Sequence, residues 1–196
     1  CYAWKPMTRS VLPALLLAVI ASATGCGKDP LTLEFDVDKD IPEQSIPGSI
    51  APCNLPISVG VLDDPFEVTM TQAEDFPEQN TDVQHVRSAK VRELSLSIAA
   101  TSSEPDWDFL DALNLFVEAS GLERKLVASI GENTESGDPI PDGATKLDLD
   151  PEGINLAPYI KANGGFTMTS EATGCAPAQE VRFTGRLEVR VVADPL

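Results

Sequence analysis

Carboxylates are the most abundant reactive groups of this chain, which has 31 Asp and Glu side chains and one histidine, His85. A nucleophilic Ser or Cys generally needs a neighbouring base such as histidine. His85 lies in a polar stretch with turn character, residues 80–87, and has no companion histidine. The sequence therefore predicts an exposed loop histidine. A glycosidase needs only two carboxylates, about 5.5 or 6.5–9.5 Å apart, so a hydrolase stays open, but no acidic pair is singled out.

Calcium is the second use that acidic side chains suggest. Residues 36–40 repeat the opening Asp-x-Asp-x-Asp of an EF-hand loop, but Ile41 stands where that loop needs Gly, and Pro47 where it needs Glu. That motif therefore fails. Two other acidic groups could join loop carbonyls around calcium, although solvated acids on the wet faces of strands explain them equally well: Asp106, Asp108 and Asp111, and Asp148, Asp150 and Glu152. We expect no cofactor, with calcium as the alternative.

Trp107, between Asp106 and Asp108, is the candidate ligand-binding aromatic residue. Sugar binding by a β-sandwich usually relies on exposed rings that stack on the sugar, and aromatic residues are few here, at 6% of the chain. Two interpretations stay open. Trp107 is a platform for a glycan, or, as we favour, it covers the edge of the core.

Alternating apolar and polar residues indicate that strands position these groups. At 31–38 and 181–193 the apolar residues recur with a period of two, which is typical of strands with one wet face. Gly185 falls on the apolar phase and marks a bend. Shorter runs of the same kind lie at 57–62, 66–71, 94–100, 125–130, 146–149 and 166–172, separated by Pro and Gly clusters, notably at 42–56 and 137–143. The sequence predicts an all-β fold, an antiparallel β-sandwich of eight or nine strands over residues 31–196.

Two segments have helical character. Residues 106–121 fit both a helical stripe and a strand, and we favour one helical turn at 107–111 followed by a strand that pairs with 126–130. Residues 155–161 predict a short helix, with Asn155 as its cap and Pro158 in its first turn. The order Cys53, Trp107, Cys175 is that of an immunoglobulin domain, but the spacing of the cysteines is too wide for one.

The N-terminal residues predict export. Arg9 precedes an apolar run at 11–23, and small residues then lead to Cys26. This is the pattern of a secretory signal peptide, and the run is too short for a transmembrane helix. Residues 23–26, Ala-Thr-Gly-Cys, resemble the lipobox of bacterial lipoproteins, with Ala23 where Leu is commonest. The resemblance implies cleavage after residue 25 and lipidation of Cys26. The alternative is ordinary cleavage, which would leave Cys26 unmodified.

The predicted domain organisation is a signal peptide at 1–25, a short lipidated tether at 26–30 and the sandwich from residue 31. A signal peptide that starts at Met7 is complete without residues 1–6, so those six residues receive no function. Two further cysteines, Cys53 and Cys175, lie in proline-flanked loops. In an oxidising compartment such a pair predicts a disulfide. Metal binding is the competing role, but no histidine accompanies these cysteines.

The net charge of the predicted mature chain limits the classes of partner that it can bind. Removing residues 1–25 removes Lys5 and Arg9 and no acid, which leaves 12 basic and 31 acidic side chains and a net charge of −19. Nucleic-acid binders and proteins that grip anionic lipid use basic patches, so neither partner is expected. Gly27 lacks the Asp that retains some lipoproteins on the inner membrane, which favours the outer one.

Two classes of function remain. The first, which we favour, is a non-enzymatic binding or structural protein of the cell envelope, anchored by lipid and contacting an envelope protein or glycan. The second is a carbohydrate-active hydrolase or glycan-binding module that uses surface carboxylates and Trp107.

Overall fold

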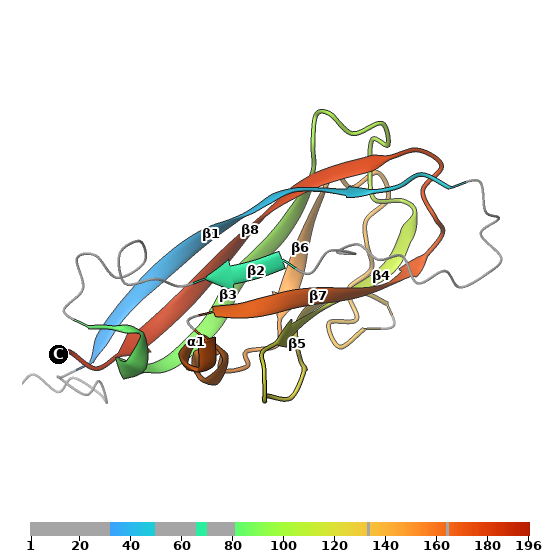
Figure 1. The fold of residues 1–196 in the computed structure, drawn as a ribbon. Coiled ribbons are helices and arrows are strands. Elements are labelled where there is room, and N and C mark those ends of the chain that lie inside the picture. The colour runs from blue at the N-terminus through green and yellow to red at the C-terminus, as the bar shows by residue number, and fades with distance from the viewer. Residues whose placement is uncertain (1–31, 50–65, 70–80, 133, 164) are drawn as a thin grey trace, which may run out of the picture.

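The computed structural model describes residues 32–49, 66–69, 81–132, 134–163 and 165–196. They form eight strands, one short α-helix and one 3-10 turn (Figure 1). In chain order these are β1 (Leu33–Ile46), β2 (Phe66–Thr69), η1 (Val83–His85), β3 (Val86–Ile98), β4 (Leu110–Glu118), β5 (Lys125–Gly131), β6 (Lys146–Pro151), α1 (Ala157–Asn163), β7 (Gly165–Gly174) and β8 (Val181–Ala193). No helix among these residues is long and apolar enough to cross a bilayer.

The strands form one curled antiparallel sheet in the order β1-β8-β3-β6-β5-β4-β7-β2. The first strand pairs with the last, β2 with β7, β3 with β6 and β4 with β5. Strand β6 is the turning point, because residues 146–149 pair with β3 and residues 150–151 with β5. This pairing is that of a jelly roll, the form of β-sandwich in which a long hairpin folds over itself. The prediction of an all-β antiparallel fold is confirmed.

The core lies between the two halves of this sheet. Strand β8 shows why the alternation in the sequence places it there, since its apolar-phase side chains are buried while Thr184 and Arg186 face outward: Val181, Phe183, Leu187, Val189, Val191 and Ala193. Gly185 also lies on the buried phase. A Cβ there would come within 2.8 Å of side-chain atoms of Ile41 and Leu96, so glycine lets the neighbouring strands close over β8.

Two strands are longer than the sequence pattern predicts, and β-bulges explain both. Strand β1 continues to Ile46, through Pro42 in the segment that the sequence indicates as a loop, and its register shifts between Ile41 and Gln44. A proline is tolerated at such a bulge on an edge strand. Strand β3 begins at Val86 rather than at residue 94. Its register against β8 shifts twice, at residues 86–88 and 91–93, so the buried positions do not keep a strict period of two.

The ambiguous segment at 106–121 is a turn followed by strand β4. The predicted helical turn is a single turn closed by the Leu110 amide, which donates to the carbonyl of Trp107 at 2.9 Å. Strand β4 then pairs with β5, as favoured. The predicted helix at 155–161 is α1, two residues further along the chain. Asn155 precedes it, and its Oδ1 accepts a hydrogen bond from the Ala157 amide at 3.0 Å. The predicted strand at 57–62 lies outside the described residues.

The register defines two ends of the molecule. At the Leu33 end, Leu33 and Val86 both lie opposite Ala193. At the Ile46 end, Ile46 lies opposite Val181 and Ile98 opposite Phe183. Backbone hydrogen bonds bring three loops together at the Ile46 end. The amides of Ala99, Trp107 and Cys175 donate to the carbonyls of Arg182, Ala144 and Phe109, in that order. Figure 1 shows the C-terminus and the start of β1 together at the other end.

Candidate functional site

An open groove of about 560 Å³ lies among the loops of the Ile46 end. Its lining combines four carboxylates with a few apolar and hydroxyl groups: Asp108, Leu110, Asp111, Glu132, Pro139, Ile140, Pro141, Asp142 and Thr173. No lysine, arginine or histidine is among these residues. The groove is therefore a strongly acidic surface, and it joins the segment after Trp107 to the loop between β5 and β6.

Asp108 holds the two walls of the groove together. Its Oδ1 accepts a hydrogen bond of 2.6 Å from the backbone amide of Gly143. Gly143 lies in a turn, closed by the Ala144 amide on the Pro141 carbonyl at 3.1 Å, and has a φ of 68°, which favours glycine. The amide of Asp108 in turn donates to Asp106 Oδ1 at 3.2 Å. One of the four carboxylates thus has a structural role.

A second glycine places Glu132 at the groove. Gly131 has a φ of 124°, and a Cβ there would lie 2.5 Å from the Cα of Ala112. Strand β5 therefore approaches β4 closely where it ends. The Gly131 amide then donates to the Asp138 carbonyl at 2.7 Å, which folds the following loop back so that Glu132 and Asp142 line the same groove.

The groove does not present a metal-binding cluster. In the described part of the chain, no three His, Cys, Asp or Glu side chains are grouped so that they could hold a metal ion. Of the first acidic group, Asp108 and Asp111 line the groove, whereas Asp106 binds the Asp108 amide. In the second, Asp148 pairs with Lys146 at 2.6 Å and Glu152 accepts from Ser129 at 3.1 Å. Carboxylates spread along a groove suit cationic or hydroxyl-bearing groups of a larger partner.

Trp107 is part of the core. Its side chain has 0% exposure, and its ring packs against Phe109 and Phe183 with centroids 5.7 and 5.4 Å away. Its Nε1 is buried with no hydrogen-bond partner among the described residues. A sugar cannot stack on a ring with no exposed surface, so the interpretation of Trp107 as a glycan platform is wrong and the core interpretation holds.

His85 lies at the Leu33 end, away from the groove. Its side chain is 43% exposed, and its Nδ1 lies 2.8 Å from Asp82 Oδ1. Asp82 also caps η1 by accepting from the amides of Gln84 and His85. The hydrogen bond to His85 is the main cause that lowers the pKa of Asp82. As predicted, this histidine is exposed, and its contacts are those of a turn.

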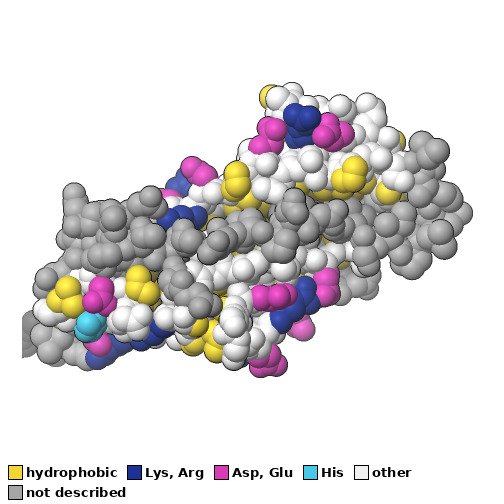
Figure 2. All heavy atoms as spheres, viewed as in Figure 1, with side chains coloured by type: hydrophobic (Ala, Val, Ile, Leu, Met, Phe, Trp, Pro, Cys, Tyr) yellow, Lys and Arg dark blue, Asp and Glu magenta, His cyan; other side chains and the backbone are white. Residues whose placement is uncertain are grey.

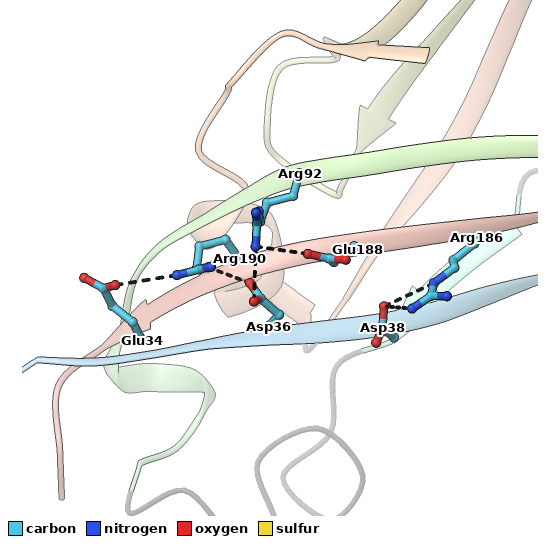
Figure 3. Close-up of polar contacts among 7 residues, drawn as sticks. All are labelled: Glu34, Asp36, Asp38, Arg92, Arg186, Glu188 and Arg190. Carbon is cyan, nitrogen blue, oxygen red and sulfur yellow. Dashed lines mark hydrogen bonds and ion pairs between the residues drawn. The ribbon is translucent and has the colours of Figure 1, made fainter. Parts of the chain in front are cut away.

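Two acids of the failed EF-hand motif, Asp36 and Asp38, lie in ion pairs on the outer face of the β1-β8-β3 layer (Figure 3). Asp36 lies 2.5 Å from Arg190 Nε and 3.3 Å from Arg92, and Asp38 lies 2.9 Å from Arg186. Arg190 also reaches Glu34 at 3.6 Å and Arg92 reaches Glu188 at 3.3 Å. We call these seven residues the ion-pair ladder. Figure 2 shows a similar pairing of charges on the visible face, where Lys and Arg side chains lie beside those of Asp and Glu.

Of the predicted cysteine sites, the structure describes only Cys175. It follows β7 at the Ile46 end, where its amide donates to Phe109 at 2.8 Å, and it takes part in a disulfide bond. Cys53 and the lipidation site Cys26 lie outside the described residues. The pairing of Cys53 with Cys175 and the lipidation of Cys26 therefore stay predictions.

The sequence alone indicates two of the four acidic residues that line the groove. Asp108 and Asp111 belong to a group that the sequence singles out, whereas Glu132 and Asp142 do not. The sequence feature that could have indicated Glu132 and Asp142 is the segment 131–145. It holds four acidic residues, several turn residues and no Lys, Arg or His.

Comparisons with known proteins give no family. No protein-family model matches the chain, and no curated protein matches it. One matching solved structure is the crystal structure of decameric BFDV capsid protein, at 8% identity and a TM-score of 0.39, over 83% of this chain and 98% of that chain. A similarity at that level carries no argument about function.

Proposed function

We propose that this protein is a lipid-anchored component of the bacterial cell envelope, with a non-enzymatic binding or structural role, and that it contacts its partner through the Ile46 end. The supporting observation is the position of the groove relative to the start of β1. They lie at opposite ends of a strand of 14 residues. At about 3.3 Å per residue, such a strand spans roughly 45 Å.

The chain order then orients the domain. Cys26 precedes Leu33 by seven positions, and seven extended residues reach at most about 25 Å. An anchor at Cys26 would keep the Leu33 end near the bilayer and leave the Ile46 end facing away from it. The partner would be a protein or glycan of the envelope that offers cationic or hydroxyl groups to the groove carboxylates. Position 27, directly after Cys26, is Gly and not the Asp that retains some lipoproteins on the inner membrane, so we propose the outer membrane.

The anchor is tested by cell fractionation and mass spectrometry of the N-terminal peptide. We expect the wild-type chain in the membrane fraction, with a diacylglyceryl group on Cys26, and Cys26→Ser in the soluble fraction. Cys53→Ser, which removes a cysteine but not the anchor, should stay with the membrane. Membrane retention of Cys26→Ser would exclude the anchor.

The binding end is tested by site-specific photo-crosslinking in cells. A crosslinker at Asp142, in the groove, should give discrete products, whereas one at Asp148, an exposed residue of β6, should not. Glu132→Gln and Asp111→Asn should weaken the Asp142 product without changing the melting temperature. Equal products from both positions would contradict a binding role for the groove.

A further inference from the structure

The first described strand of the chain is paired with the last from end to end, apart from Pro42 and Glu43 at the bulge. Strand β1 makes twelve register pairs with β8, from Leu33 opposite Ala193 to Ile46 opposite Val181. The strands are antiparallel, so β1 begins at the Leu33 end and β8 begins at the Ile46 end. A pull on the start of β1 and a pull on the start of β8 therefore act in opposite directions along the two strands.

This geometry decides how the pair responds to tension. Hydrogen bonds between antiparallel strands run perpendicular to the strands. When two strands are pulled past each other along their axes, all these bonds are loaded together. When the strands are pulled apart from one end, the bonds are loaded and broken one pair at a time. The same twelve pairs thus resist the first pull much more strongly than the second.

The ion-pair ladder crosses the same boundary. Glu34 and Asp36 on β1 pair with Arg190 on β8, and Asp38 pairs with Arg186. Asp36 also pairs with Arg92, which belongs to β3 on the far side of β8. Figure 3 shows these side chains in a row along the strands. Sliding β1 along β8 must separate the pairs that Glu34, Asp36 and Asp38 make. The Arg92 contact of Asp36 also ties β1 to a third strand.

We infer that the β1–β8 pair transmits tension between the anchored end of the protein and whatever is bound at the Ile46 end, and that it resists this tension in shear. The biological setting rests on the proposed function, because it needs an anchor before β1 and a partner at the opposite end. When the disulfide bond of Cys175 is reduced and carries no load, the mechanical property itself depends on the register and the ladder. The protein would then serve as a stiff link that holds an envelope component at a fixed distance from the membrane.

Single-molecule force spectroscopy on the full chain tests this inference, in dithiothreitol so that the disulfide bond of Cys175 carries no load. Handles are attached through azide-bearing residues placed at Thr32 and Ala178 in one protein, and at Thr32 and Leu196 in another. The first pair pulls β1 and β8 past each other, since Ala178 lies just before β8, and the second peels them apart from the Leu33 end. At the same loading rate, we expect the Thr32–Ala178 protein to rupture at the higher force, because its twelve strand pairs are loaded together. Equal or reversed forces would overturn the inference.

The ladder is tested by two matched substitutions. Asp36→Asn removes a carboxylate that crosses to β8 and β3, whereas Asp148→Asn breaks the pair with Lys146 within β6. Asp36→Asn should lower the Thr32–Ala178 force and Asp148→Asn should not. If both leave it unchanged, the ladder has no part in the resistance. These results are independent of Cys26 lipidation, so failure of the anchor and failure of the mechanical inference are distinguishable.

Discussion

The indole ring of Trp107 meets the phenyl ring of Phe183 edge-on, with an interplanar angle of 63° and centroids 5.4 Å apart. This contact joins the segment that leads into β4 with strand β8, and so links the two halves of the sheet. Phe183 and Trp107 are both fully buried. Edge-to-face contacts of this kind stabilise a core beyond the area that they bury.

Trp107→Ala should destabilise the fold by about 3–5 kcal/mol, because it leaves a large cavity between the halves. Trp107→Phe should cost less, since it keeps an aromatic ring and removes the unpartnered buried Nε1. Urea unfolding followed by circular dichroism measures both. A loss below about 1 kcal/mol for the alanine variant would contradict a core role.

Asn155→Ala should destabilise the protein by about 1–2 kcal/mol. Asn155 Oδ1 accepts from the amides of Ala89 and Ala157, both at 3.0 Å, and so fixes the start of α1 against β3. Asn155→Asp retains this acceptor and loses only the donation to the Arg87 carbonyl, so its loss should be smaller. Thermal melts of the two variants give the comparison, and equal losses would show that the acceptor is not what matters.

Tyr159 should make stability fall at alkaline pH. Burial raises the pKa of the Tyr159 phenol, and the charge of Glu123 raises it further. The phenol donates a 2.6 Å hydrogen bond to the Glu123 carbonyl and needs its proton to do so. A raised pKa in the folded state favours folding below the unfolded pKa of about 10, and this contribution is lost as pH rises above it. Tyr159→Phe should flatten the decline in melting temperature above pH 10, and an unchanged slope would contradict it.

The Cys53–Cys175 pairing should appear as a linked peptide in a proteolytic map of the unreduced protein. A bridge that closes some 120 residues stabilises by up to about 4–5 kcal/mol in the chain-entropy model. Dithiothreitol should therefore lower the urea midpoint of the wild type, and should leave that of a Cys53→Ser, Cys175→Ser double variant unchanged. Alkylation of both thiols in the native unreduced protein would exclude the pair.

The fold class could be predicted because strands such as β8 keep a strict alternation over most of their length. The start of β3 could not, because two bulges shift Val86, Ala89 and Val91 out of a single phase. Pro42 indicated a loop, and a bulge accommodates it within β1. Bulges depend on the partner strand, which a period count along one segment does not contain.

The candidate site was harder to predict than the fold. The burial of Trp107 depends on packing against Phe183, which is 76 positions away in the sequence. The groove needs the Asp108–Gly143 hydrogen bond to bring two loops together. Both are long-range contacts between segments that look like ordinary loops when each is taken alone.

The pairing of the first and last described strands also sets the order in which the protein can fold. Strand β1 has β8 as its neighbour in the sheet, so it finds its place only after β8 has been synthesised. Until then the apolar side chains of β1 that are buried in the folded protein, among them Val37 and Ile41, lack their partner strand. A topology so rich in distant pairings folds slowly, and a chain of this kind stands to gain from a chaperone that shields the first strand until β8 is in place.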